Sequence, residues 1–319
     1  MRTENDHPKS LIEAVRYFAD PDVCHRYMVR IKWPDGKIAC PKCEGDNVGE
    51  IKSRRMFQCR VKGCRKQFST KVGTIFEDSP LSLDKWFVAV WCIANCKNGI
   101  SSPELGRTLG ITQKSAWHVL HRIRLAMRTG TFRKLSGEIE SDETYIGGLA
   151  INMHKSRRAK KIKSTGYVGK QIVQGILERG GDLRVKHVAN PKRRTLHREI
   201  HEHVEPGSAI YTDTLQSYIG LDQCFIHRMI NHAKAYVEGR VHTNGLENFW
   251  SLLKRAIRGT YVWVSPEHLQ AYLDEQARRF NSRKMNDGQR FLNVLANVLA
   301  NVIGRRLRYD DLTSRVVAA

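Results

Sequence analysis

The chain has 319 residues, of which 54 are Lys or Arg and 32 are Asp or Glu, so its formal net charge at pH 7 is +22. An excess of this size favours a polyanionic partner, with nucleic acid ahead of a membrane surface. The sequence has no run of eighteen apolar residues, and residues 1–7 lack the pattern of a signal peptide. We therefore expect a multidomain cytoplasmic protein with no membrane partner.

Residues 1–35 form the first predicted region, a helical segment, and residues 36–72 form the second. The second region contains two pairs of cysteines, Cys40 with Cys43 and Cys59 with Cys64. Residues 44–58 separate the pairs and are long enough for a β-hairpin. Disulfides are rare in the cytoplasm, and four thiolates at tetrahedral geometry suit Zn²⁺. This region therefore predicts a zinc ribbon.

Residues 80–130 are predicted to be a helical DNA-binding domain. A short helix that opens at Ser101-Ser102-Pro103 is followed by a glycine turn at 110–112 and a basic helix over 113–127. This is the pattern of a helix-turn-helix, whose second helix enters the major groove. The same pattern also occurs in ordinary helical bundles, so the hypothesis depends on the nearby ribbon and the charge. The candidates for DNA contacts on the second helix are Gln113, Lys114, His118 and Arg122.

From Gly137 the pattern changes to short strands, and residues 137–285 are predicted to be an α/β domain. The strands are expected at 138–146, 171–178, 183–188, 209–213 and 225–230, and the helices at 195–203, 242–255 and 267–280. A basic segment between 153 and 170 is either a solvated loop or a phosphate-contacting one. Residues 286–319 are expected to form a C-terminal helix and tail. The fold class expected for the whole chain is therefore multidomain α+β.

Three acidic residues of this α/β region are candidate metal ligands. Asp142 is in the first strand, Asp213 ends the fourth, and Glu247 is in the helix after the fifth. This order matches the ribonuclease-H-like layout, in which three acids meet at one edge of the sheet. Their oxygens suit Mg²⁺ or Mn²⁺, and two such ions about 3.5–4 Å apart would support an in-line phosphodiester displacement.

Two further acids flank Asp142. Side chains alternate along a strand, so Glu140 shares the face of Asp142 and Glu143 points to the other face. Glu140 is therefore the alternative ligand if the strand register differs from our assignment.

The helix over 242–255 has its apolar residues at helical spacing. Glu247 and Lys254 are two turns apart and project together, with Asn244 beside them. Without the upstream aspartates, a solvated charge pattern would be the better interpretation.

Several of these segments resemble bacterial insertion-sequence transposases of the zinc-ribbon group related to the ISXO type and to eukaryotic Merlin elements. The matching segments are Asp-Glu-Thr-Tyr-Ile-Gly-Gly at 142–148, Tyr-Thr-Asp at 211–213, the helix at 242–255, and Ser-Pro-Glu-His-Leu at 265–269 through Arg-Phe-Asn at 279–281. The cysteine pairs and the helix-turn-helix match as well, so the resemblance covers most of the chain.

The resemblance implies a DDE-class transposase in which Asp142, Asp213 and Glu247 bind the metal ions and Lys254 accompanies them. Arg255 joins the DNA-contacting candidates. Some relatives have asparagine at the third position, and we choose Glu247 over Asn244 because its spacing to Lys254 fits. Also implied are cleavage at terminal inverted repeats, strand transfer into target DNA, a nucleoid-associated location in a bacterium, and a homodimer or larger assembly.

Three other functions compete with this interpretation. One is a DNA-binding regulator with an inactive nuclease-like domain, against which the three intact acids argue. Another is a nuclease or junction resolvase that cuts without strand transfer, and the predicted DNA-end-binding domains argue against it. The third is an inactive copy of a transposase.

Overall fold

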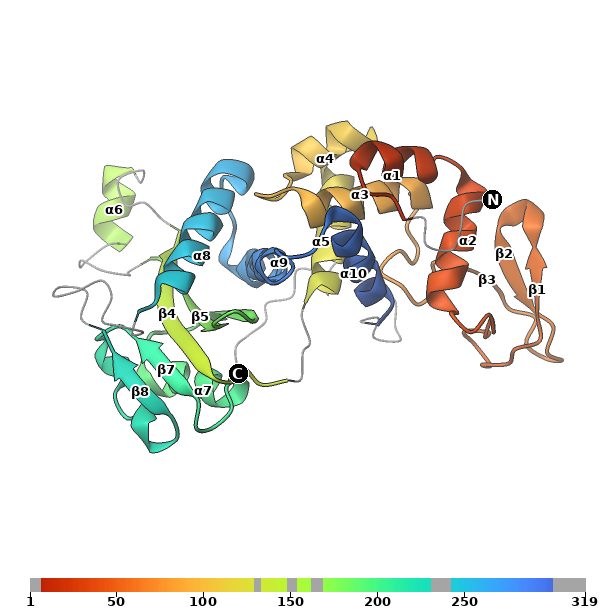
Figure 1. Cartoon of the computed structure of the whole chain (residues 1–319). Coiled ribbons are helices and arrows are strands. Elements are labelled where there is room, and N and C mark those ends of the chain that lie inside the picture. The colour runs from red at the N-terminus through yellow and green to blue at the C-terminus, as the bar shows by residue number, and fades with distance from the viewer. Residues whose placement is uncertain (1–6, 129–132, 148–153, 162–168, 231–241, 301–319) are drawn as a thin grey trace. The chain divides into compact units, whose positions relative to one another are not determined.

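The computed structural model describes residues 7–128, 133–147, 154–161, 169–230 and 242–300. The described chain divides into two compact units (Figure 1). The first contains residues 7–127 and 284–300, and the second contains the described residues from 128 to 283. No helix in these ranges is long and apolar enough to cross a bilayer.

The first unit is built on a helical core. Its helices are α1 (Leu11–Tyr17), α2 (Pro21–Lys32), α3 (Leu83–Asn95), α4 (Ser102–Leu109), α5 (Gln113–Met127) and α10 (Asp287–Ala300). Helix α3 is almost wholly apolar and buries Trp86, Phe87 and Trp91 at its centre. Phe291 of α10 packs on Trp91, with ring centroids 5.3 Å apart. The predicted C-terminal helix thus completes the core of the N-terminal unit.

A small antiparallel sheet carries the cysteine pairs of the first unit. Its strands are β1 (Val48–Ile51), β2 (Met56–Cys59) and β3 (Gln67–Ser69), in that spatial order. Residues Lys52–Arg54 form a 3₁₀ turn between β1 and β2, so the predicted hairpin is present. In its core the fully buried apolar side chains other than cysteine are Phe57 and Phe68, and the others packed there are only partly buried. A core this small needs further stabilisation, such as a bound metal ion.

The turn between α4 and α5 is set by two glycines. Gly110 ends α4 with φ +62°, a conformation that side chains disfavour. A Cβ at Gly106 would lie 3.0 Å from the carbonyl oxygen of Ile111, so the turn passes close to α4 there. The Thr112 hydroxyl then accepts from the backbone N–H of Ser115 and starts α5. The predicted pair of helices with a short turn is therefore present.

The second unit contains a five-stranded sheet with the order β6-β5-β4-β7-β8. The strands are β4 (Glu138–Ile146), β5 (Gln171–Glu178), β6 (Leu183–Val188), β7 (Ala209–Thr212) and β8 (Ile226–Met229). The first three in chain order are antiparallel neighbours, and β7 and β8 extend the sheet in parallel from β4. All five predicted strands are present, with small differences at their ends.

Helices cover both faces of this sheet. Helix α7 (Arg193–His203) packs on one face through Leu196 and Ile200. Helices α8 (Asn244–Arg255) and α9 (Leu269–Asn281) share a core with β5 and β6 on the other. A Cβ at Gly175 would lie 2.8 Å from both Leu246 and Trp250. This glycine therefore lets α8 approach the sheet beside Asp142, its partner on β4.

Candidate active site and metal centre

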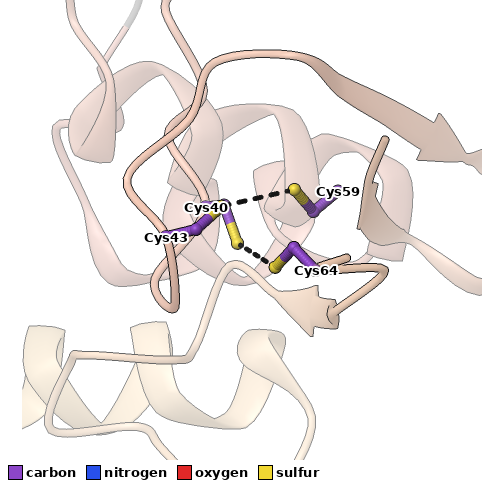
Figure 2. Close-up of side chains that lie close together, drawn as sticks. All are labelled: Cys40, Cys43, Cys59 and Cys64. Carbon is purple, nitrogen blue, oxygen red and sulfur yellow. Dashed lines mark hydrogen bonds between the residues drawn. The ribbon is translucent and has the colours of Figure 1, made fainter. Parts of the chain in front are cut away.

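The four predicted zinc ligands come together in the first unit (Figure 2). The Sγ atoms of Cys40 and Cys64 are 3.7 Å apart, and those of Cys43 and Cys59 are 3.6 Å apart. Sulfur atoms about 2.3 Å from a tetrahedral Zn²⁺ lie about 3.8 Å from one another, so the spacing fits zinc. All eight cysteines are free of disulfide bonds.

The electrostatics of the cluster also call for a cation. Burial, followed by neighbouring thiols, raises the pKa of Cys59 to about 12. Burial opposes ionisation of Cys40 too, but hydrogen bonds from the backbone at Lys42 and Cys43 lower its pKa to about 7. Four adjacent thiolates would repel one another. A divalent cation offsets that repulsion with its positive charge and displaces the thiol protons as it binds.

In the second unit, the sheet register aligns two of the predicted acids. Strands β4 and β7 pair in parallel with Glu138 opposite Ala209, an offset of 209 − 138 = 71. Asp142 and Asp213 are separated by 213 − 142 = 71, so Asp213, just past the end of β7, is at the level of Asp142. The two carboxylates are close enough for the charge on Asp213 to raise the pKa of Asp142.

Trp250 is the direct partner of Asp142. Its indole Nε1 donates a 2.8 Å hydrogen bond to Oδ2 of Asp142. Burial, above all, raises the pKa of Asp142 to about 6; Trp250 opposes the rise, and the charges of Asp213 and Glu247 add to it. The sequence prediction treated Trp250 only as part of an apolar stripe, although an indole N–H in a buried stripe needs an acceptor.

Glu143 points to the opposite face, as predicted. The Tyr218 hydroxyl donates a 2.6 Å hydrogen bond to Glu143 Oε2. Burial raises the pKa of Glu143 to about 7; the hydrogen bond from Tyr218 lowers it, and the charges of Asp213 and Asp142 raise it. This edge of the sheet therefore carries several carboxylates that repel one another.

Helix α8 carries the remaining predicted residues, and of these Glu247 is close enough to influence the pKa of Asp142. Glu247 and Asn244 are exposed in its first turns, Lys254 is partly buried in its last turn, and Arg255 is exposed. Within the described ranges, the groups of three or more ligand atoms within 4.8 Å of one another are the four cysteines and Glu199-Glu202-His203 of α7. Asp213 and Glu247 both interact electrostatically with Asp142, but the three carboxylates are not all within 4.8 Å of one another.

Glu140 has a different partner set from Asp142. Its Oε2 accepts a 3.1 Å hydrogen bond from the backbone N–H of Leu246, in the first turn of α8. Its Oε1 accepts from Arg179 at 2.9 Å, and Arg179 in turn donates to the carbonyl of His242. The carboxylate is buried and anchors the N-terminus of α8, a role that the sequence prediction missed.

The candidate DNA contacts on α5 differ in exposure. Gln113 and Lys114 are exposed at the start of the helix. His118 is partly buried, and burial, with the charges of Arg122 and Lys114, lowers its pKa. Arg122 donates to the carbonyls of Ile75 and Glu77, at 3.0 and 2.8 Å, so it ties α5 to the segment before α3.

The basic segment at 153–170, expected to be a solvated or a phosphate-contacting loop, is described only in part, and its described middle is a helix rather than a loop; residue 153 lies outside the described residues. Helix α6 (Lys155–Lys161) belongs to it, and residues 162–168 lie outside the described residues.

A cluster of four thiols together with a sheet that bears several carboxylates is typical of a class of proteins that process nucleic acids. Comparisons with known proteins agree with this class. An ISXO2-like transposase domain model matches residues 134–281, and a transposase zinc-ribbon domain model matches residues 20–67. An uncharacterized protein in transposable element ISH50 of Halobacterium salinarum is 28% identical over 271 residues, 81% of this chain and 90% of the relative.

A second relative is an uncharacterized transposase-like protein of Haemophilus influenzae. It is 38% identical over 99 residues, which are 31% of this chain and 80% of the relative. The chain therefore belongs to the ISXO2-like transposases with a zinc ribbon, and the resemblance noted from its motifs is confirmed.

Proposed function

We propose that this protein is a DDE-type DNA transposase that cleaves DNA at the terminal inverted repeats of an insertion sequence and joins the freed ends to target DNA. The observation that carries the proposal is the register that aligns Asp213 with Asp142, beneath the helix of Glu247 and Lys254. We also propose that the fold of residues 137–285 is ribonuclease-H-like. The strand order supports this, since β6-β5-β4-β7-β8 becomes 3-2-1-4-5 when β4 is counted as the first strand.

Asp142, Asp213 and Glu247 would hold Mg²⁺ or Mn²⁺. Carboxylate oxygens are the donors that these ions prefer. Burial, and then the charges of Asp213 and Glu247, raise the pKa of Asp142, and a bound cation would offset both effects. When bound, the ions supply a nucleophile at neutral pH and stabilise the leaving oxygen.

The protein's own side chains have separate tasks in this scheme. Trp250 orients Asp142 through its indole N–H. Lys254, two turns after Glu247 on the same helix, neutralises phosphate charge near the scissile bond. The Glu140 and Arg179 contacts fix the start of α8, so the position of Glu247 relative to the sheet depends on them.

DNA recognition falls to the first unit in this proposal. Residues 80–130 act as a helix-turn-helix, with Gln113, Lys114 and His118 near the start of α5 contacting bases. The ribbon of residues 36–72 binds Zn²⁺ and adds contacts to DNA or to a second copy. Because an element has two ends to hold together, the active form is a homodimer or a larger assembly.

The test is strand cleavage and strand transfer on a labelled duplex that carries the element's own terminal repeat, with Mg²⁺ or Mn²⁺. We expect metal-dependent joining by the wild type and none by Glu247→Gln. Glu205→Gln, which changes an exposed glutamate of the same unit, is the matched control and should stay active.

Other outcomes would favour the competing functions. Cleavage without joining would identify a nuclease, and specific binding without cleavage a regulator or an inactive copy.

A further inference from the structure

The backbone at Val262 has a conformation that β-branched residues almost never adopt. Its φ is +63° and its ψ is −52°, and the N–H of Trp263 donates a 2.6 Å hydrogen bond to the carbonyl of Tyr261. These are the features of the rare γ-turn with positive φ, which is strained. Strain of this kind persists only where surrounding contacts hold it, and it gathers at functional sites.

Both sides of this turn are anchored. The Tyr261 ring packs on Tyr272 of α9 with centroids 4.7 Å apart, and its hydroxyl donates to the buried carboxylate of Glu275. On the other side, Val264 packs against the core beneath α8 and α9. The turn therefore cannot relax without breaking these contacts.

The anchored turn holds two apolar side chains in solvent. Val262 is 76% exposed and Trp263 is 72% exposed, the highest fractions among the exposed large hydrophobic residues in the described ranges. Exposure of an indole has an unfavourable hydration cost, and here the strained backbone adds to that cost. Folding alone gives no reason for either cost, so the arrangement indicates a binding partner.

The surroundings indicate a polyanion as that partner. A π-helix, Ala256–Tyr261, continues directly from α8 to the turn (Figure 1). Arg255 and Arg258 are exposed on this stretch, and no described acidic side chain forms an ion pair with either. A partner for this stretch must therefore offer an apolar or aromatic surface to Trp263 and negative charge to these arginines. A nucleic acid offers phosphates and the flat face of a base together.

We propose that Trp263 stacks on an unpaired nucleobase of the DNA substrate, with Arg255 and Arg258 contacting the adjoining phosphates. The inference rests on the proposed function, since it takes DNA as the substrate, and it adds a specific contact to that function. Lys254 and Tyr261 are seven residues apart on a continuous helical stretch that becomes a π-helix at Ala256, so it spans at most about 10 Å, the length at the α-helical rise of about 1.5 Å per residue. The stacked base would therefore lie at most about three nucleotides from the phosphate near Lys254, at roughly 3.4 Å per nucleotide.

Two duplexes test this proposal, both carrying the element's terminal repeat. One is fully paired, and the other has three mismatched pairs beside the cleavage position. Each contains 2-aminopurine at the expected position, because its fluorescence falls when it stacks. Affinity is measured by anisotropy without Mg²⁺, so that binding is separated from cleavage.

The wild type should bind the mismatched duplex more tightly and quench its 2-aminopurine. Trp263→Ala should weaken that binding about 5- to 100-fold and abolish the quenching, and Trp263→Phe should retain much of both. Val262→Gly keeps the indole but relaxes the turn, so it should raise the melting temperature and reduce the preference for the mismatched duplex. Ile226→Ala, which truncates another exposed apolar side chain of the same unit, should change neither duplex's affinity.

Three outcomes would overturn the inference. If Trp263→Ala matches the wild type in affinity and quenching while the wild type cleaves DNA, stacking is wrong and the transposase function stands. If the variant changes only the oligomeric state in light scattering, Trp263 contacts protein. A wild type that binds and cleaves neither duplex would sink both proposals.

Discussion

The indole N–H of Trp250 donates a 2.8 Å hydrogen bond to the carboxylate of Asp142, 108 residues earlier in the chain. Trp250 lies one turn after Glu247 on α8, so the helix that carries one predicted acid also orients another. The contact requires the close approach of α8 to β5, which only a glycine at position 175 permits. The geometry of the carboxylates thus depends on how this helix packs.

Trp250→Phe should weaken metal binding while it keeps most of the packing. The indole hydrogen bond lowers the pKa of Asp142, so its loss raises that pKa above about 6 and favours the protonated form, which binds cations poorly. Losing such a supporting contact costs about 10- to 100-fold in metal affinity. The check is the cleavage rate against pH at subsaturating Mg²⁺, where the acid limb should move to higher pH. Phe249→Leu, in the same buried stripe, should leave the limb in place.

Asp142→Asn should stabilise the protein when divalent ions other than Zn²⁺ are removed. Burial and neighbouring charges raise the pKa of Asp142 from 3.8 to about 6, so the folded state holds a proton that the unfolded chain releases at lower pH. Stability therefore falls as pH rises from about 4 to about 6, by at most about 3 kcal/mol. An asparagine at this position has no carboxyl group to ionise, so the Asp142→Asn variant does not lose this stability as the pH rises.

Thermal unfolding at several pH values checks this prediction. The advantage of Asp142→Asn should be largest above about pH 6.5 and should shrink towards about pH 4.5. Added Mg²⁺ should raise the melting temperature of the wild type only. An advantage that does not vary with pH would show that the charge of Asp142 is not its source.

Glu140→Gln should separate a structural acid from a metal-binding one. The change removes the charge that pairs with Arg179 at 2.9 Å, and a broken buried pair costs about 3–5 kcal/mol when one partner is lost entirely. The amide oxygen can still accept from Leu246, so we expect a smaller loss, roughly 1–3 kcal/mol. Denaturant unfolding gives the stability. Because the retained contact with the N–H of Leu246 still holds the start of α8, the Mg²⁺ dependence of cleavage by the folded variant should stay close to that of the wild type. A lost Mg²⁺ dependence at unchanged stability would instead make Glu140 a ligand.

Cys59→Ser should release zinc and unfold the ribbon. Cys59 is a fully buried member of the four-thiol cluster, and a three-thiolate site binds Zn²⁺ much more weakly. Metal analysis of the purified protein should fall from about one zinc per chain to near zero. Cys224→Ser changes an exposed cysteine outside the cluster and should retain the ion. Equal zinc content in the two variants would disprove the four-cysteine site.

Local patterns predicted much of this structure. The spacing of the cysteines predicted the thiolate cluster, and the periodicity of the strands predicted the five-stranded sheet, because both signals lie within short segments. The separation of 71 residues between Asp142 and Asp213 equals the offset of the β4 and β7 pairing. That agreement is a property of the sequence, although only the sheet reveals it.

Tertiary packing decided the rest, since these contacts join residues far apart in the chain. Glu140 and Asp142 share one face of β4 and have the same chemistry, yet one anchors the start of α8 and the other meets Trp250. Arg122, a predicted DNA contact, binds backbone carbonyls at 75 and 77, and α10 completes a core that begins near residue 14. The amino-acid order determined which elements form and which side chains they carry. Their partners were set by three-dimensional close packing, which no local pattern encodes.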